Sequence, residues 1–112
     1  MHGYVARANV DHYVGILNES SLTAQHRSTT TGLLVAELDK LSEGTEHLEF
    51  AESKVADSRR QVARAASARD STSLGTTERH LAEKNLVQLE TLHTVLDDFC
   101  HRLRNKIGSR SP

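Results

Sequence analysis

The last long stretch of the chain, 77–107, limits the possible folds more than any other part of the sequence. Its apolar residues recur mostly at steps of three and four, which places them on one side of an α-helix. They are Leu81, Ala82, Leu86, Leu89, Leu92, Leu96, Phe99, Leu103 and Ile107. A helix over this stretch is about 45 Å long. Its apolar stripe is too continuous to remain in water, so the rest of the chain or a second copy must cover it.

Three further helices are predicted before this one, at about 10–18, 23–42 and 45–69. Asn9 and Thr23 are suited to cap the first two, because their side chains accept hydrogen bonds from backbone amides of the first turn. The residues before Asn9 show no clear period, and we expect them to be frayed.

The segment 42–45 allows two interpretations. Gly44 can end one helix and Thr45 can cap the next, which predicts a tight reversal. The apolar spacing nevertheless continues through the segment, since Leu34, Leu38, Leu41, Thr45 and Leu48 keep alternating steps of four and three. A turn between separate helices has no reason to preserve this spacing. We therefore favour one continuous or kinked helix over 23–69 and keep the reversal as the alternative.

The second half of the chain is predicted to form an antiparallel hairpin. The segment 70–76 contains Gly75 and several capping side chains, so it is expected to be the loop, with Thr76 or Thr77 as the next cap. The helices on both sides are acidic first and basic later, so an antiparallel pairing opposes unlike charges. We expect Gly108 to end the last helix and the tail 108–112 to be disordered.

The fold class that follows is all-α, with one domain over 1–112. An antiparallel helical hairpin or coiled coil is completed by the N-terminal helices into a three- or four-helix bundle. The predicted interaction seam consists of Leu48, Val55, Val62, Leu86, Leu89, Leu96 and Leu103.

Composition excludes several classes of protein. The chain has 37% hydrophobic residues, no Trp and only two Phe and two Tyr, so a thick core with a deep pocket is not expected. The net charge of −1 gives no global field for nucleic acid or an anionic membrane. A single cysteine, Cys100, rules out an intrachain disulfide and suits a reducing compartment. No apolar run approaches the roughly 20 residues that span a bilayer. The cytoplasm is therefore the expected location.

The only candidate metal ligands lie on the last helix. His93, Asp97 and Cys100 stand at i, i+4 and i+7, with His101 just beyond, and these side chains are of types that bind Zn²⁺. The spacing matches no established zinc motif. The alternative is that His93 and Cys100 are half-buried packing residues and Asp97 is solvated. We therefore expect no cofactor.

Two further patterns in the sequence bear on function. Histidine phosphotransfer domains carry an exposed His followed by Lys-Gly at the third and fourth positions, but after His80 the Lys comes one position late and no Gly follows. An arginine-rich face could contact phosphates. It consists of Arg59, Arg60, Arg64 and Arg69. No aromatic residues are interleaved for base stacking, so nucleic acid is not an expected partner.

Two stretches resemble short, uncharacterised all-helical bacterial proteins, a group with no assigned activity. The first is Asn9-Val-Asp-His12-Tyr13 with Leu17, Arg27 and Leu33-Leu34-Val-Ala-Glu37-Leu-Asp-Lys-Leu41. The second is Val55-Ala-Asp-Ser-Arg-Arg-Gln-Val-Ala-Arg64 with Asp70, Leu86, Leu89, Leu92-His93 and Arg102-Leu103. The resemblance implies a small all-helical protein and transfers no catalytic or ligand-binding residue.

The expected function is that of a non-catalytic helical interaction or assembly module that self-associates as a homodimer. A chain with so little aromatic core buries more apolar surface by pairing. The alternative is a small regulatory or sensor protein that responds to metal or pH through its seven histidines. Glycines are scattered singly and Cys100 has no identifiable base, so an enzyme is not expected.

Overall fold

The computed structural model describes residues 2–42 and 46–110, and it confirms the all-α prediction. The described residues form four helices and no strand. The helices are α1 (His2–Leu17), α2 (Ala24–Leu41), α3 (Leu48–Asp70) and α4 (Thr77–Arg110).

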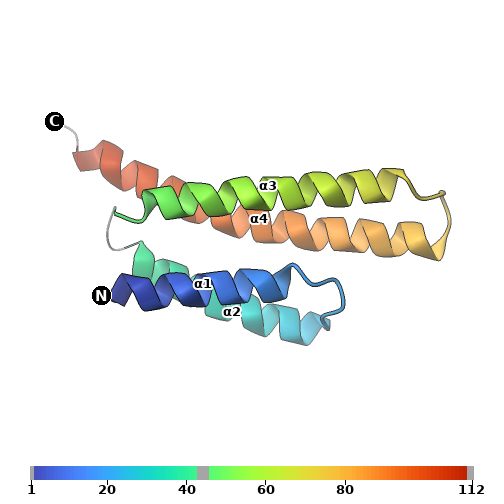
Figure 1. Cartoon of the computed structure of the whole chain (residues 1–112), viewed down its shortest axis with the longest axis horizontal. Helices are drawn as coiled ribbons and strands as arrows, with labels where there is room; N and C mark the ends of the chain where they lie inside the picture. Colours follow the sequence, from blue (N-terminus) through green and yellow to red (C-terminus); the bar gives the residue numbers. More distant parts are fainter. Residues whose placement is uncertain (1, 43–45, 111–112) are drawn as a thin grey trace.

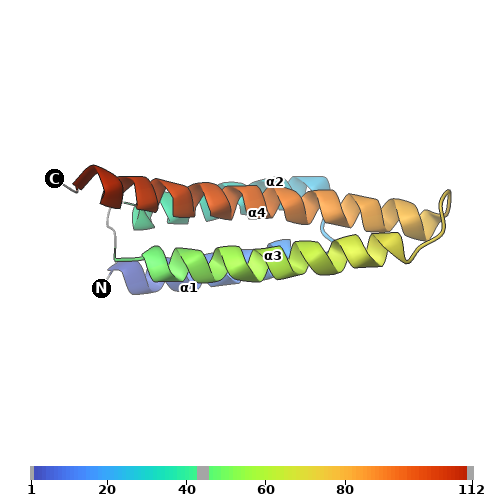
Figure 2. The same cartoon turned by 90° about the horizontal axis from the view of Figure 1, so that it is seen from above.

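The helices are arranged as two antiparallel hairpins that lie side by side (Figures 1 and 2). The first hairpin consists of α1 and α2, and the second consists of α3 and α4. Seen from above, α1 lies on the same side as α3 and α2 on the same side as α4 (Figure 2). The backbone of α4 approaches both α1 and α2. The second hairpin is the longer one and continues beyond the end of the first, so its loop end is not covered (Figure 1). The result is an elongated molecule of 54 × 28 × 16 Å.

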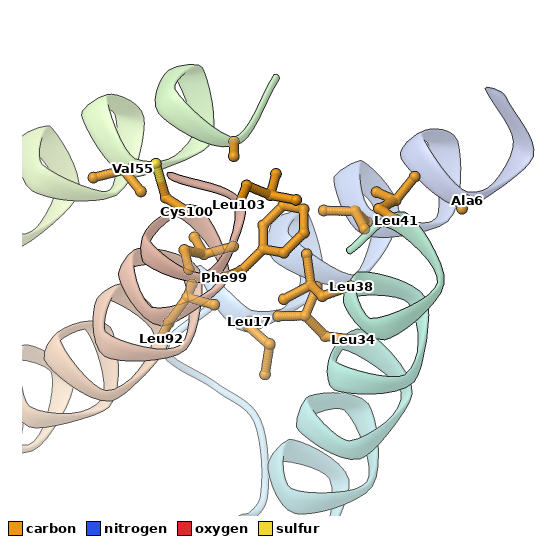
Figure 3. Packing of buried hydrophobic residues seen from close by; sticks show 13 residues of the cluster. Ala6, Leu17, Leu34, Leu38, Leu41, Val55, Leu92, Phe99, Cys100 and Leu103 are labelled. Atoms are coloured by element: carbon orange, nitrogen blue, oxygen red, sulfur yellow. The ribbon is translucent and has the colours of Figure 1, made fainter. Parts of the chain in front are cut away.

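The main hydrophobic core lies where the two hairpins overlap, and all four helices contribute to it. Phe99 of α4 points into its centre, close to Leu34 and Leu38 of α2 and Leu103 of α4 (Figure 3). Burying a side chain of this size contributes about 1.5–3 kcal/mol. A smaller cluster of Ala65, Leu86 and Leu89 lies further along α3 and α4, where no residue of the first hairpin takes part.

The first helix begins earlier than the sequence pattern predicted. α1 starts at His2, so Asn9 lies inside the helix and is not its cap, and the expected fraying of the residues before it is wrong over 2–8. Ala6 is buried one turn before Val10 and extends the same apolar stripe. An alanine does not stand out in a search for large apolar residues, and this is why the first two turns were missed.

The helix favoured over 23–69 is wrong, because α2 and α3 are separate and belong to different hairpins. Ser42 ends α2 and donates its backbone N–H to the carbonyl of Leu38. Gly44 and Thr45, the residues of the alternative turn, lie outside the described residues. Leu41 and Leu48 pack on the same core from two helices, and this shared core also satisfies the continuous spacing. The apolar spacing therefore could not distinguish one helix from two.

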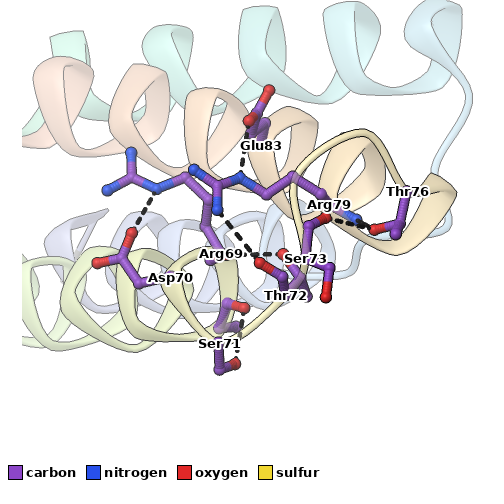
Figure 4. Close-up of polar contacts among 9 residues, drawn as sticks. Arg69, Asp70, Ser71, Thr72, Ser73, Thr76, Arg79 and Glu83 are labelled. Atoms are coloured by element: carbon purple, nitrogen blue, oxygen red, sulfur yellow. Dashed lines mark hydrogen bonds and ion pairs between the residues drawn. The ribbon is translucent and has the colours of Figure 1, made fainter.

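The expected caps at Thr23 of the first hairpin and Thr76 of the second, and the expected loop of the second hairpin, are confirmed. Thr23 accepts a hydrogen bond from the backbone N–H of His26 at 3.1 Å, and Thr76 accepts one from Arg79 at the same distance. Gly75 has a φ of +79°, in the left-handed region that favours glycine. The Arg79 side chain closes the loop by donating to the Thr72 carbonyl and pairing with Glu83 at 2.9 Å (Figure 4).

The end of α4 corrects a second expectation. The helix continues through Gly108 to Arg110, so Gly108 does not end it and the predicted tail is helical over 108–110. Residues 111 and 112 lie outside the described residues.

The predicted charge pairing of the second hairpin is found at one end. Arg104 of α4 lies 3.8 Å from Glu52 of α3, as the antiparallel order requires. At the loop end the ion pairs are local instead, since Arg69 pairs with Asp70 and Arg79 pairs with Glu83. Both Arg–acid pairs are short range in sequence, so they fix the loop and add nothing to the choice of orientation.

Candidate functional site

The seven residues of the predicted interaction seam contact other helices of the same chain. Val55, Leu86, Leu89, Leu96 and Leu103 are buried, and Leu48 and Val62 are partly buried against the two hydrophobic clusters. They join α3 to α4 and α4 to the first hairpin. In this fold the seam is therefore occupied by the chain itself and is not available to a second copy.

The candidate metal ligands point in different directions. Cys100 is buried, whereas Asp97 and His101 are exposed. The Nδ1 atom of His93 lies 3.2 Å from the hydroxyl of Ser58 on α3. Burial raises the pKa of the Cys100 thiol and so disfavours the thiolate that binds metals. Within residues 2–42 and 46–110, no three His, Cys, Asp or Glu side chains are grouped to hold a metal ion.

The arginine-rich face is partly neutralised by its own helix. Arg60 pairs with Asp57, and Arg69 pairs with Asp70. Arg59 and Arg64 are exposed and form no ion pair with another residue that the structure describes. Two arginines in this setting give a weak positive surface and no stacking platform.

The uncovered end of α4 carries an exposed apolar residue on a face that is buried elsewhere along the same helix. We define the distal face as Glu78, Leu81, Lys84, Asn85 and Gln88, which recur at steps of three and four. Further along α4 the same side of the helix carries Leu92, Phe99 and Leu103, which are buried under the first hairpin. Leu81 is 58% exposed and lies in the second turn of α4, near the loop end of the second hairpin, which continues beyond the first hairpin (Figure 1).

Two cavities lie beside the distal face. One of about 350 Å³ is formed by Ser20, in the loop of the first hairpin, and by Leu81, Ala82, Lys84, Asn85 and Gln88 of α4. A smaller cavity of about 100 Å³ also borders Gln88 and is lined in addition by Leu17, Arg27, Thr31, Val87, Thr91 and Leu92. Val87 at its edge is also exposed. The loop end of the molecule thus combines exposed apolar side chains with concave surface.

The polar contacts that hold the two hairpins together lie at the opposite end. Arg102 of α4 pairs with Asp39 of α2 at 3.0 Å, and Lys106 donates to the Ser42 carbonyl. Between α1 and α3, Lys54 pairs with Asp11. No ion pair between the two hairpins involves the described residues of the distal face.

Arg7 and His47 form the most specific of these contacts. The Nε atom of Arg7 donates to Nδ1 of His47 at 2.9 Å, so His47 must carry its proton on Nε2 when it is neutral. The Nε2 atom lies 3.5 Å from a carboxylate oxygen of Glu46. Arg7 and Lys54 both stack over the Phe50 ring, 5.2 and 5.3 Å from its centroid.

The environment of His47 opposes its protonation. Its ring is buried, and burial lowers its pKa, with a further lowering from the positive charge of Arg7 and an opposing effect from Glu46. A proton on Nδ1 would also remove the acceptor that Arg7 uses. The contact between α1 and α3 therefore depends on a neutral His47.

A polar cleft runs beside this contact between α1 and α3. It has a volume of about 310 Å³ and is lined by Asp11, Val14, Gly15 and Asn18 of α1, by Lys54, Asp57, Ser58, Arg60, Gln61 and Arg64 of α3, and by Leu92. Its acidic side chains are paired with Lys54 and Arg60. Asp11 and Asp57 are thus each engaged by a cation, and the Ser58 hydroxyl of the cleft lies 3.2 Å from Nδ1 of His93.

No family model, no curated protein and no solved structure matches the sequence. The helices of the described residues also include none that is long and apolar enough to cross a membrane.

The sequence pattern did not identify Arg7, His47 or Lys54 as a group. Arg7 lay in the stretch expected to fray, and the three residues are far apart in the chain. The one local signal is Phe50 with Lys54 one helical turn later, whereas Arg7 reaches the Phe50 ring from another helix. Leu81 was recognised as part of the apolar stripe, but its exposure depends on the length of the first hairpin.

Proposed function

We propose that the protein is a non-catalytic helical assembly module that self-associates. The observation that carries this proposal is the exposure of Leu81 on a face of α4 that is fully covered at Phe99. Exposed apolar side chains that continue a buried stripe are typical of a contact surface. Leu74 in the neighbouring loop is exposed as well and adds to the apolar surface of this end.

The internal packing supports the choice of surface. The predicted seam is filled by the chain's own helices, so self-association through the seam would require the hairpins to open. Contact at Leu81 needs no such rearrangement, because that part of the distal face is already exposed.

The test is the oligomeric state measured by analytical ultracentrifugation from micromolar to submillimolar concentration. The proposal expects a reversible increase in mass to that of a dimer over this range. A protein that stays monomeric at the highest concentration, with a cooperative thermal transition, would contradict it.

A second candidate function is a response to pH, and the contact between Arg7 and His47 favours it. Loss of this contact in acid would loosen α1 from α3 while leaving the second hairpin intact. The expected result is that amide hydrogens of α1 exchange faster at about pH 5 than at about pH 7 after correction for intrinsic rates, while those of α4 do not. Equal protection of α1 at both values would remove this candidate.

We further propose a cytoplasmic location. It is supported by the chain's single thiol, Cys100, which lies in the core and is suited to a compartment that keeps thiols reduced. Fluorescence microscopy of the tagged protein in its own cell tests this location.

A further inference from the structure

We propose that two copies of this chain dimerise through the distal face of α4, with the two α4 helices antiparallel about a two-fold axis at Leu81. This inference rests on the proposed function, since it names the surface and the partner of the self-association. The occupant of the distal face is therefore a second copy of the same surface.

The order of charges on the distal face is self-complementary. Glu78 and Lys84 lie three residues before and three residues after Leu81. In an antiparallel pair centred on Leu81, Glu78 of each copy meets Lys84 of the other, and the two Leu81 side chains meet at the axis. A parallel pair would oppose like charges at both positions, which is unfavourable.

Both charged residues are available for such a contact. Glu78 and Lys84 are exposed, and neither forms an ion pair within the part of the chain that the structure describes. The neighbouring Glu83 is already paired with Arg79 and lies off the distal face. The charge pattern that would select the register is thus not used inside the monomer.

The same register brings an exposed leucine to a cavity. Leu74 lies in the loop just before α4, and Gln88 lies two turns after Leu81, so an antiparallel pair centred on Leu81 brings the loop end of one copy towards Gln88 of the other. Gln88, Ser20 and Leu81 line the cavity of about 350 Å³. Leu74 is 81% exposed, and insertion into this cavity would remove its side chain from water.

The contact is limited to the end of the molecule that the first hairpin leaves free. An interface of this extent is at the small end for specific complexes, so we expect a reversible dimer whose population depends on concentration. The pairing surface closes on itself through the two-fold axis, which stops assembly at two copies.

The test uses charge reversal and mixing. Glu78→Lys or Lys84→Glu alone opposes like charges at both contacts, and each is expected to raise the dimer dissociation constant roughly tenfold. An equimolar mixture of the two variants restores unlike pairs in the heterodimer, and so does the double variant with itself. Sedimentation of each variant, of the mixture and of the double variant measures these effects.

Glu90→Lys is the matched control, because Glu90 is an exposed acidic residue on the opposite side of α4. It should leave the dissociation constant unchanged. Leu81→Glu places two carboxylates at the axis and should give a monomer that melts at nearly the same temperature. Circular dichroism checks that each variant folds.

The outcomes separate this inference from the proposed function. Weak single variants with a restored mixture support the antiparallel register. A wild-type dimer that none of these substitutions affects overturns the distal face as the contact but leaves self-association standing. A wild-type monomer at all concentrations overturns both, and the distal face is then free or belongs to a different partner.

Discussion

Leu81 and Phe99 lie on the same side of α4, eighteen residues and therefore five helical turns apart, but only Phe99 is covered. Phe99 is 0% exposed under the first hairpin, and Leu81 is 58% exposed beyond its end. One continuous sequence pattern thus has two different environments. The difference comes from the lengths of the two hairpins and not from the helix itself.

The first prediction compares these two residues. Phe99→Ala should lower the free energy of unfolding by about 3–5 kcal/mol, because it leaves a cavity among all four helices. Leu81→Ala should change it by less than about 0.5 kcal/mol, because its side chain is already largely in water. Urea unfolding at a concentration below that of self-association measures both values. Similar losses for the two variants would contradict the arrangement of the hairpins.

The second prediction concerns pH. The pKa of His47 is lowered in the folded state, so between this pKa and the unfolded value of about 6.5 the unfolded chain binds more protons. The stability from the Arg7–His47 contact is therefore present above about pH 6.5 and is lost as the pH falls below it. Urea unfolding of the wild type at several pH values should show this decline.

His47→Asn is the matched variant for this prediction. Asparagine keeps an acceptor near the position of Nδ1 but does not titrate in this range. We expect the slope of unfolding free energy against pH between about 5 and 6.5 to become smaller in this variant. An unchanged slope would assign the pH dependence to other groups.

The third prediction concerns Arg27, which joins the end of α1 to α2. Its guanidinium donates to the carbonyls of Leu17 and Glu19 at 3.0 and 2.7 Å, where the last carbonyls of a helix need partners. Arg27→Ala should lower the free energy of unfolding by about 1.5–3 kcal/mol. Arg64→Ala, at an exposed arginine on α3, should have an effect of less than about 0.5 kcal/mol. Thermal and urea unfolding of the two variants decide this.

The fourth prediction compares two glycines. Gly75→Ala should destabilise the protein by about 1 kcal/mol, because a φ of +79° strains any residue with a Cβ atom. Gly32→Ala should stabilise it by about 0.5–1 kcal/mol, because Gly32 lies in α2 with nothing within 4 Å of an added Cβ. Opposite signs in the same denaturation experiment are the expected result. A gain at Gly75 would show that the loop adopts another conformation in solution.

The sequence predicted the helices well where large apolar residues mark the buried side. The run from Leu86 to Leu103 gave α4 and its buried side, and the caps at Thr23 and Thr76 were correct. The start of α1 was missed because Ala6 is small. The break between α2 and α3 was missed because both helices pack on one core. The spacing of apolar residues stays the same whether the chain continues straight or reverses its direction.

The candidate site was less predictable for a different reason. Whether Leu81 is covered depends on where the first hairpin ends relative to α4, and this is a property of tertiary packing. The Arg7–His47 contact likewise joins residues forty positions apart. The candidate metal ligands do not meet at one point, because successive residues of a helix point in directions about 100° apart. Cys100 is accordingly buried, whereas His101 is exposed.

The direction of the helices sets how this protein can be attached to others. α1 begins and α4 ends at one end of the molecule, and the loop with Gly75 lies at the far end (Figure 1). A domain or tag fused to either side of the chain is therefore held away from the loop. If two copies dimerise near their loops, domains fused to the two chains lie at the two far ends of an elongated dimer and are held apart by it.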